Sequence, residues 1–163
     1  MAYKIQTSQL GYPRIAQKDT SAKVSLGTIV TAEDPTYGTG EFIYLKGVAS
    51  CVLGSWVTYK TEGGTTALLA ANAIGPVAVA MAATTASYYG WFQIEGLAVG
   101  KCLTQMASNT RVWITGTAGS VDDASVAGDG VNLAKSAALT VVGSLVTTFE
   151  IHRPWVNDRT SFS

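Results

Sequence analysis

The stretch Tyr88-Tyr-Gly-Trp-Phe-Gln-Ile-Glu95 is the most aromatic segment of the chain and gives the clearest indication of its fold. Aromatic residues favour strands, and successive side chains of a strand point to opposite faces of the sheet. Phe92 and Ile94 share one face, which we expect to be the core face. Trp91 and Glu95 share the other, an amphipathic combination that we expect to border an interface.

Segments of the same kind recur from Ile29 onward, separated by Gly, Pro, Asn and Asp, which is typical of strands joined by turns. The central residues of 41–46 favour a strand and place apolar side chains on both of its faces, so both faces are expected to be covered. In residues 77–81, large side chains alternate with alanine, which leaves room for close packing. Counting such segments predicts roughly seven to nine strands, a number that fits a barrel or a sandwich. The sequence therefore predicts an all-β fold, as a single β-barrel, β-tulip-like or sandwich domain.

Three local predictions accompany this fold class. Residues 65–73, rich in Ala and Leu, form the only plausible short helix. Residues 116–132, rich in Gly, Asp and Ser, predict a long loop or a pair of turns. Residues 138–142 and 145–152 predict a closing hairpin around the turn Gly143-Ser144.

The two ends of the chain lack a sustained period of either 2 or 3.6 residues, so we expect an extended N-terminal arm over 1–28, a β-rich body over 29–152 and a C-terminal tail over 153–163. Apolar and aromatic side chains are scattered along both ends. Together with one aromatic residue of the body, they are the candidate anchors for contacts with a partner or another subunit: Tyr3, Ile5, Leu10, Tyr12, Ile15, Trp91, Trp155 and Phe162.

Composition narrows the classes of partner. Only 13% of the residues are charged, about half the ~25% usual for soluble domains, and sparse charge promotes association. The formal net charge is zero and no cluster of Lys or Arg occurs, which argues against nucleic acid. The longest apolar stretch, residues 67–83, is interrupted and shorter than the ~20 residues of a membrane span. No secretory signal pattern opens the sequence, so synthesis in the cytoplasm is expected.

No motif for catalysis, cofactor binding or metal binding stands out, and we expect neither an enzyme nor a cofactor. His152 has no second histidine or motif nucleophile beside it. The acidic residues Asp122, Asp123 and Asp129 lack calcium-loop spacing and are better interpreted as solvated turn residues. Cys51 and Cys102 lie among apolar neighbours, which favours buried thiols, although the sequence leaves a disulfide open.

Four segments resemble head decoration proteins of tailed bacteriophages, the small proteins that attach to the outside of a mature capsid. They are Tyr37-Gly-Thr-Gly-Glu-Phe-Ile-Tyr-Leu-Lys46, Gly75-Pro-Val-Ala-Val-Ala80, Tyr89-Gly-Trp-Phe-Gln-Ile-Glu-Gly96 and Thr117-Ala-Gly-Ser-Val-Asp-Asp123. The similarity covers about residues 37–130, without the two ends.

The resemblance implies a β-barrel or β-tulip-like body, often trimeric, that binds the phage major capsid protein on the capsid exterior, stabilises the head and needs no cofactor. The expected location is the virion. Two alternative functions are consistent with the same composition. One is a structural protein of the phage tail or head–tail junction, and the other is a carbohydrate-binding β module. The second is suggested by Trp56, Tyr88, Trp91 and Trp113, because aromatic faces stack on sugars.

Overall fold

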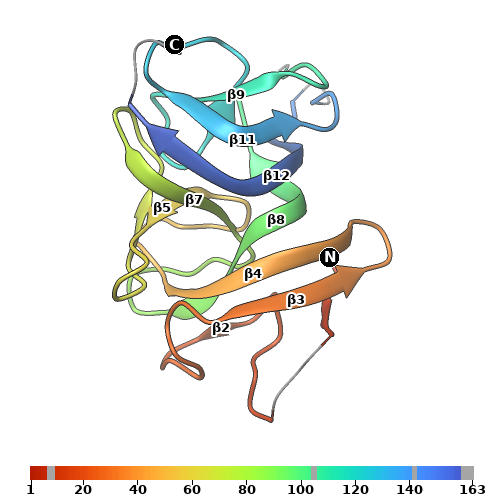
Figure 1. The fold of residues 1–163 in the computed structure, drawn as a ribbon, viewed down its shortest axis with the longest axis vertical. Coiled ribbons are helices and arrows are strands. Elements are labelled where there is room, and N and C mark those ends of the chain that lie inside the picture. The colour runs from red at the N-terminus through yellow and green to blue at the C-terminus, as the bar shows by residue number, and fades with distance from the viewer. Residues whose placement is uncertain (7–9, 104–105, 141–142, 159–163) are drawn as a thin grey trace.

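A computed structural model describes residues 1–6, 10–103, 106–140 and 143–158 and has an all-β fold, as the sequence predicts. Of these residues, 48% lie in strands and none lies in a helix. The strands are β1 (Lys4–Ile5), β2 (Lys18–Asp19), β3 (Ile29–Asp34), β4 (Gly38–Lys46), β5 (Trp56–Tyr59), β6 (Thr66–Leu68), β7 (Ile74–Ala80), β8 (Tyr89–Lys101), β9 (Arg111–Ile114), β10 (Val121–Asp122), β11 (Gly130–Ser136) and β12 (Val146–Asn157) (Figure 1).

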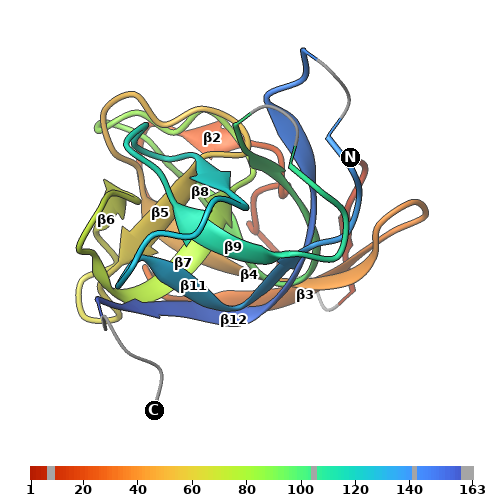
Figure 2. The ribbon, with the colours of Figure 1, turned by 90° about the horizontal axis from the view of Figure 1, so that it is seen from above.

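All these strands belong to one antiparallel sheet that does not close into a barrel. The main path runs β1-β3-β4-β8-β7-β12-β11-β9-β10, while β2 pairs with β8, and β5 joins β6 to β7. Strand β8 connects the two ends of the molecule, because its first half pairs with β4 and its second half with β12. Seen from above, β12 bends around one side of the molecule (Figure 2).

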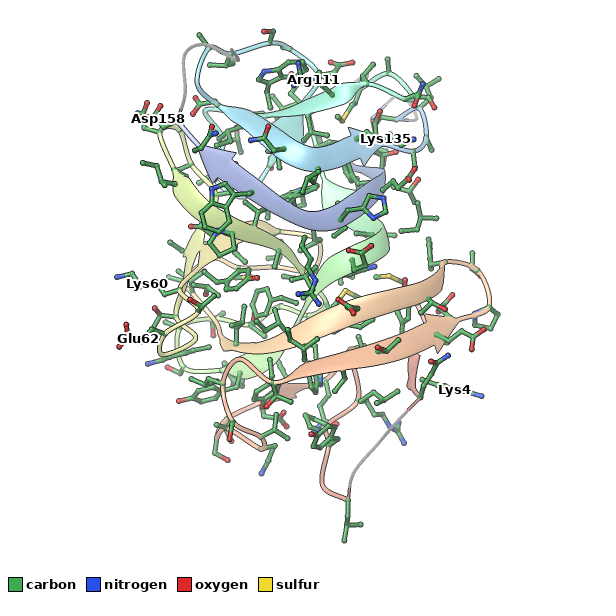
Figure 3. All side chains as sticks on the ribbon, viewed as in Figure 1. Lys4, Lys60, Glu62, Arg111, Lys135 and Asp158 are labelled. Carbon is green, nitrogen blue, oxygen red and sulfur yellow. The ribbon has the colours of Figure 1, made fainter. Side chains whose placement is uncertain are left out.

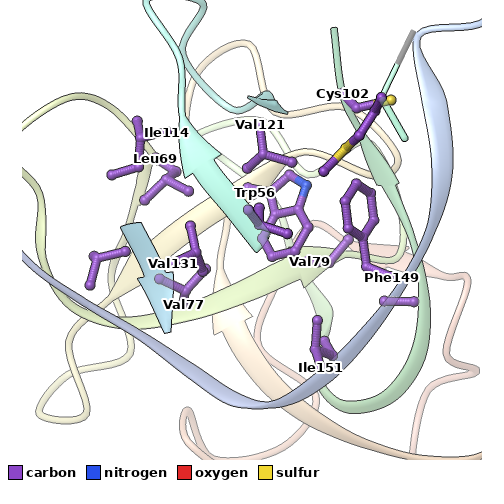
Figure 4. Close-up of a cluster of buried hydrophobic side chains, with 14 residues drawn as sticks. Trp56, Leu69, Val77, Val79, Cys102, Ile114, Val121, Val131, Phe149 and Ile151 are labelled. Atoms are coloured by element: carbon purple, nitrogen blue, oxygen red, sulfur yellow. The ribbon is translucent and has the colours of Figure 1, made fainter. Parts of the chain in front are cut away.

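Among the residues that the structure describes, three buried clusters form the core, and the central strands contribute to more than one of them. In β4, Phe42 and Ile43 point to different clusters, so both faces of this strand are covered, as expected from its sequence. In β7, Val79 and Ala80 likewise divide between two clusters. The largest cluster packs Trp56 of β5 edge-on against Phe149 of β12, with ring centroids 5.0 Å apart (Figure 4).

The N-terminal segment covers the face of the sheet that carries Trp91. The Trp91 Nε1 group donates a hydrogen bond to the Pro13 carbonyl oxygen at 3.0 Å, and the Tyr44 hydroxyl donates to Asp19 Oδ2 at 2.9 Å. Ile15 is buried in the same cluster. Burial raises the pKa of Tyr44 to about 12. The described part of residues 1–28 therefore packs on the body of its own chain.

Two local predictions are wrong. Residues 66–68 form strand β6 rather than part of a helix, because pairing with β5 outweighs the helix propensity of Ala and Leu. The strand that precedes β12 and pairs with it is β11, at 130–136, rather than 138–142, of which residues 141 and 142 lie outside the described residues. The expected loop at 116–132 accordingly contains β10 and the start of β11.

The two cysteines are free and buried in different clusters, so no disulfide joins them in this structure. Burial raises the pKa of both thiols. Each sulfur lies 3.5 Å from a threonine hydroxyl, Thr84 for Cys51 and Thr140 for Cys102.

Candidate interaction face

The solvent side of β12 and its neighbours is the surface that best fits a binding role. In β12 the buried side chains of Phe149 and Ile151 alternate with more accessible ones, which places the latter on the outer side of the sheet. Strands β11 and β7 flank β12 and contribute exposed residues of their own. We call this surface the β12 face and define it by Ile74, Asn132, Leu133, Lys135, Glu150, His152, Arg153 and Trp155; Figure 3 labels Lys135 on β11.

A bulge in the β11–β12 ladder shapes this face. Asn132 pairs with Trp155 and Ala134 with Ile151, so three residues of β12 lie opposite Leu133 alone. Both strands adopt left-handed backbone here, with φ of 60° at Leu133 and 49° at Arg153. Pro154 lies in the bulge, one of the few positions at which a strand tolerates the missing N–H of proline. The strand therefore continues through Pro154 to Asn157.

Leu133 and Trp155 present apolar surface on either side of the bulge. Leu133 is 63% exposed and Trp155 is 46% exposed. The Asn132 side-chain amide donates a hydrogen bond to the Trp155 carbonyl oxygen at 3.2 Å, which ties the two strands together beside them. A shallow hollow of about 210 Å³ lies next to Leu133, lined also by Ala134, Lys135, Glu150 and His152.

A row of charged side chains borders these apolar residues. Lys135 Nζ lies 2.9 Å from Glu150 Oε2, and Arg153 Nη2 lies 2.6 Å from Glu41 Oε2. The His152 ring lies between two carboxylates, with Nδ1 2.7 Å from Glu95 Oε1 and Nε2 3.2 Å from Glu150 Oε1. Hydrogen bonds from Lys135 and then His152 hold the pKa of Glu150 below its ordinary value.

The candidate anchors of the N-terminal segment fall into two groups. Tyr3, Ile5, Tyr12 and Ile15 pack against this chain's own core, and the hydroxyl of Tyr3 donates a hydrogen bond to the Leu97 carbonyl oxygen at 3.2 Å. Burial raises the pKa of Tyr3 to about 12. Leu10, by contrast, is fully exposed.

The remaining candidate anchors differ in whether their side chains are accessible to a partner. Trp91 is completely buried, so it offers no surface to a partner. The N-terminal segment covers its face of the strand, which appears in the sequence only as an amphipathic pattern. Trp155 lies on the β12 face, and Phe162 lies outside the described residues.

The acidic residues considered as a cation site serve as hydrogen-bond acceptors for backbone groups. Asp129 Oδ1 accepts from the Asn72 N–H at 2.8 Å, and Asp123 Oδ2 accepts from the Ala107 N–H at 2.7 Å. Over the described residues, no group of three or more His, Cys, Asp or Glu side chains is arranged to hold a metal ion. The same residues contain no helix long and apolar enough to cross a membrane.

The aromatic residues that suggest sugar binding do not form a common surface. Trp56 and Trp91 are completely buried. Trp113 and Tyr88 are partly covered, and each has a cationic side chain over its ring, Arg111 at 5.8 Å and Lys18 at 4.9 Å respectively. No observation in the described structure favours the carbohydrate-binding alternative.

Sequence reasoning missed Leu133 and Ile74 as surface residues. An apolar residue within a β-rich segment is ordinarily expected to be buried, and no sequence pattern indicates that a leucine adopts positive φ. The only available signal was Pro154, since a proline in a strand indicates an edge or a bulge.

Searches of protein-family models and of curated protein sequences found no match to this chain.

Proposed function

We propose that this chain is a non-enzymatic structural protein of a phage virion that binds the major capsid protein on the capsid exterior and stabilises the head. The β12 face is the attachment surface in this proposal. The resemblance of residues 37–130 to head decoration proteins supports the capsid as the partner and a homotrimer as the expected oligomer.

The observation that carries the proposal is the conformation of Leu133. A bulky residue with positive φ is a conformational outlier, at a cost of about 1–3 kcal/mol. Leu133 is nevertheless 63% exposed, so burial of its own side chain does little to offset that cost within this chain. Burial of the remaining exposed part of this leucine against a partner would supply about 1–2 kcal/mol. The neighbouring Trp155 and Arg153 are residue types enriched among the strongest contributors to protein interfaces.

The direct test mixes the purified full-length protein with expanded, undecorated phage heads and counts the bound copies by gel densitometry. Attachment at hundreds of copies per head is the expected result. Absence of binding would refute the capsid role, and a count of only a few copies would favour the tail or head–tail junction.

The variant Leu133→Asn separates binding from folding. Asparagine tolerates positive φ better than leucine, so we expect the free energy of unfolding to stay constant or rise by up to about 1 kcal/mol. Loss of the apolar side chain should weaken head binding by about tenfold or more.

Leu139→Asn is the matched control, since Leu139 is 65% exposed, has no positive φ and lies outside the β12 face. It should bind heads as the unmodified chain does. Equal binding by the Leu133→Asn protein would remove the β12 face from the proposal.

A further inference from the structure

The His152 ring is placed so that both of its nitrogens face a carboxylate. Nδ1 lies 2.7 Å from Glu95 Oε1 on β8, and Nε2 lies 3.2 Å from Glu150 Oε1 on β12 itself. A neutral imidazole has only one N–H and would direct the lone pair of its other nitrogen at a carboxylate oxygen. Only the imidazolium form donates to both partners, so this geometry selects the charged ring.

The charges around the ring favour the same form. Lys135 of β11 pairs with Glu150, and Arg153 of β12 pairs with Glu41 of β4. Glu41 stands directly opposite Glu95 in the β4–β8 ladder, an arrangement of like charges that is unfavourable without a cation between the strands. The row thus holds three carboxylates and two permanent cations, and it is neutral only when His152 carries the third positive charge.

The ring sits where the sheet divides. His152 and Glu95 form the last pair of the β8–β12 ladder, and from Trp155 onward β12 pairs with β7 instead. The backbone is irregular on both strands at this level, with φ of 97° at Gly96 and 49° at Arg153. A Cβ atom added at Gly96 would lie 2.5 Å from the Thr39 carbonyl oxygen, so the strands approach closely here.

We propose that His152 is a protonation-dependent link that holds the end of β12 to β8 while the ring is charged and loosens this end of the ladder when the ring loses its proton. The link is a property of the fold and does not depend on the function proposed above. The hydrogen bond to Glu95, followed by that to Glu150, raises the pKa of His152 above its ordinary value of 6.5.

The direction of the pH effect follows from that raised pKa. A group whose pKa is higher in the folded state contributes stability that is fully present below its unfolded pKa and is lost as pH rises through its folded pKa. The ladder should therefore be tightest below pH 6.5 and loosen as the pH rises through the higher pKa of His152 in the folded state. The His152 side chain is 55% exposed, so solvent and salt screen the effect and keep it small.

The first experiment is a proton NMR titration of the full-length protein, in which the single histidine gives an unambiguous signal. The midpoint should lie above 6.5 and should fall in Glu95→Gln, with a smaller fall in Glu150→Gln. A midpoint at or below 6.5 in the unmodified chain would overturn the proposal even if every variant failed to fold.

The second experiment measures hydrogen-exchange protection factors at several pH values on either side of the titration midpoint. Amides of residues 95–101 and 146–152 should lose roughly two- to fivefold in protection as the ring deprotonates, the range expected for an exposed ion pair. The loss should be absent in His152→Gln, which is neutral throughout. Residues 56–59 and 66–68, in the β5–β6 ladder, serve as the internal control. The same pH dependence in His152→Gln, or in the control ladder, would show that His152 is not the link.

Discussion

Arg153 adopts a left-handed backbone conformation that costs a non-glycine residue roughly 1–2 kcal/mol, and its side chain is held by Glu41. Replacing it with alanine removes the ion pair and retains the strain, whereas glycine removes both. Glycine also loses more backbone entropy on folding, by about 0.5–1 kcal/mol. We therefore expect Arg153→Gly to be more stable than Arg153→Ala by about 0.5–1 kcal/mol in chemical denaturation.

The same pair of substitutions at Lys135 should give the opposite order. Lys135 also forms a surface ion pair but has no positive φ, so glycine there should be less stable than alanine. An identical order at both positions would mean that backbone strain does not decide the result at Arg153. None of this could be predicted from the sequence, because positive φ at arginine or leucine arises from the pairing of β12 with β11 and β7, which is a tertiary effect.

The N-terminal segment behaves as an element of the core rather than as a free arm over its described residues. Ile15 is buried in the Trp91 cluster, while Leu10 is fully exposed. We expect Ile15→Ala to lower the free energy of unfolding by about 2–5 kcal/mol, and Leu10→Ala to change it by less than about 0.5 kcal/mol. Urea denaturation of the two variants measures both. A small effect of Ile15→Ala would show that this segment detaches without consequence.

The strands themselves were predicted best where their residues alternate or are apolar on both faces, as in β4, β7 and β8, because burial fixes the side-chain period. The C-terminal end of β12 was not predicted. A tail was expected from residue 153, yet β12 continues to Asn157 because the bulge leaves Pro154 without a required N–H donor. The packing of the N-terminal segment over Trp91 could not be predicted from the sequence either, since residues 1–28 have no hydrophobic period that indicates which side chains are buried.

At the scale of the whole molecule, the three clusters are joined by strands that they share. Strand β8 contributes Trp91 to one cluster, Phe92 and Ile94 to the second and Ala98 to the third. Loss of β8 from any one cluster would expose apolar surface in the other two, so the clusters should not unfold independently. The prediction of an all-β fold from short β-favourable segments separated by turn residues holds at this scale, while the open path of the sheet depends on long-range pairing that no local pattern encodes.

Shared strands predict a single cooperative transition, which two tryptophans can report separately. Trp56 lies in the cluster at the β12 end and Trp91 in the cluster under the N-terminal segment. In a background in which Trp113 and Trp155 are replaced by phenylalanine, Trp56→Phe and Trp91→Phe each leave a single reporter. In urea, each protein's fluorescence transition should coincide with its own far-ultraviolet circular dichroism transition. Comparison within one protein removes the difference in stability that each substitution causes. If either fluorescence transition preceded the loss of strand signal, the two ends would be separate folding units, and the shared strands would not couple the clusters.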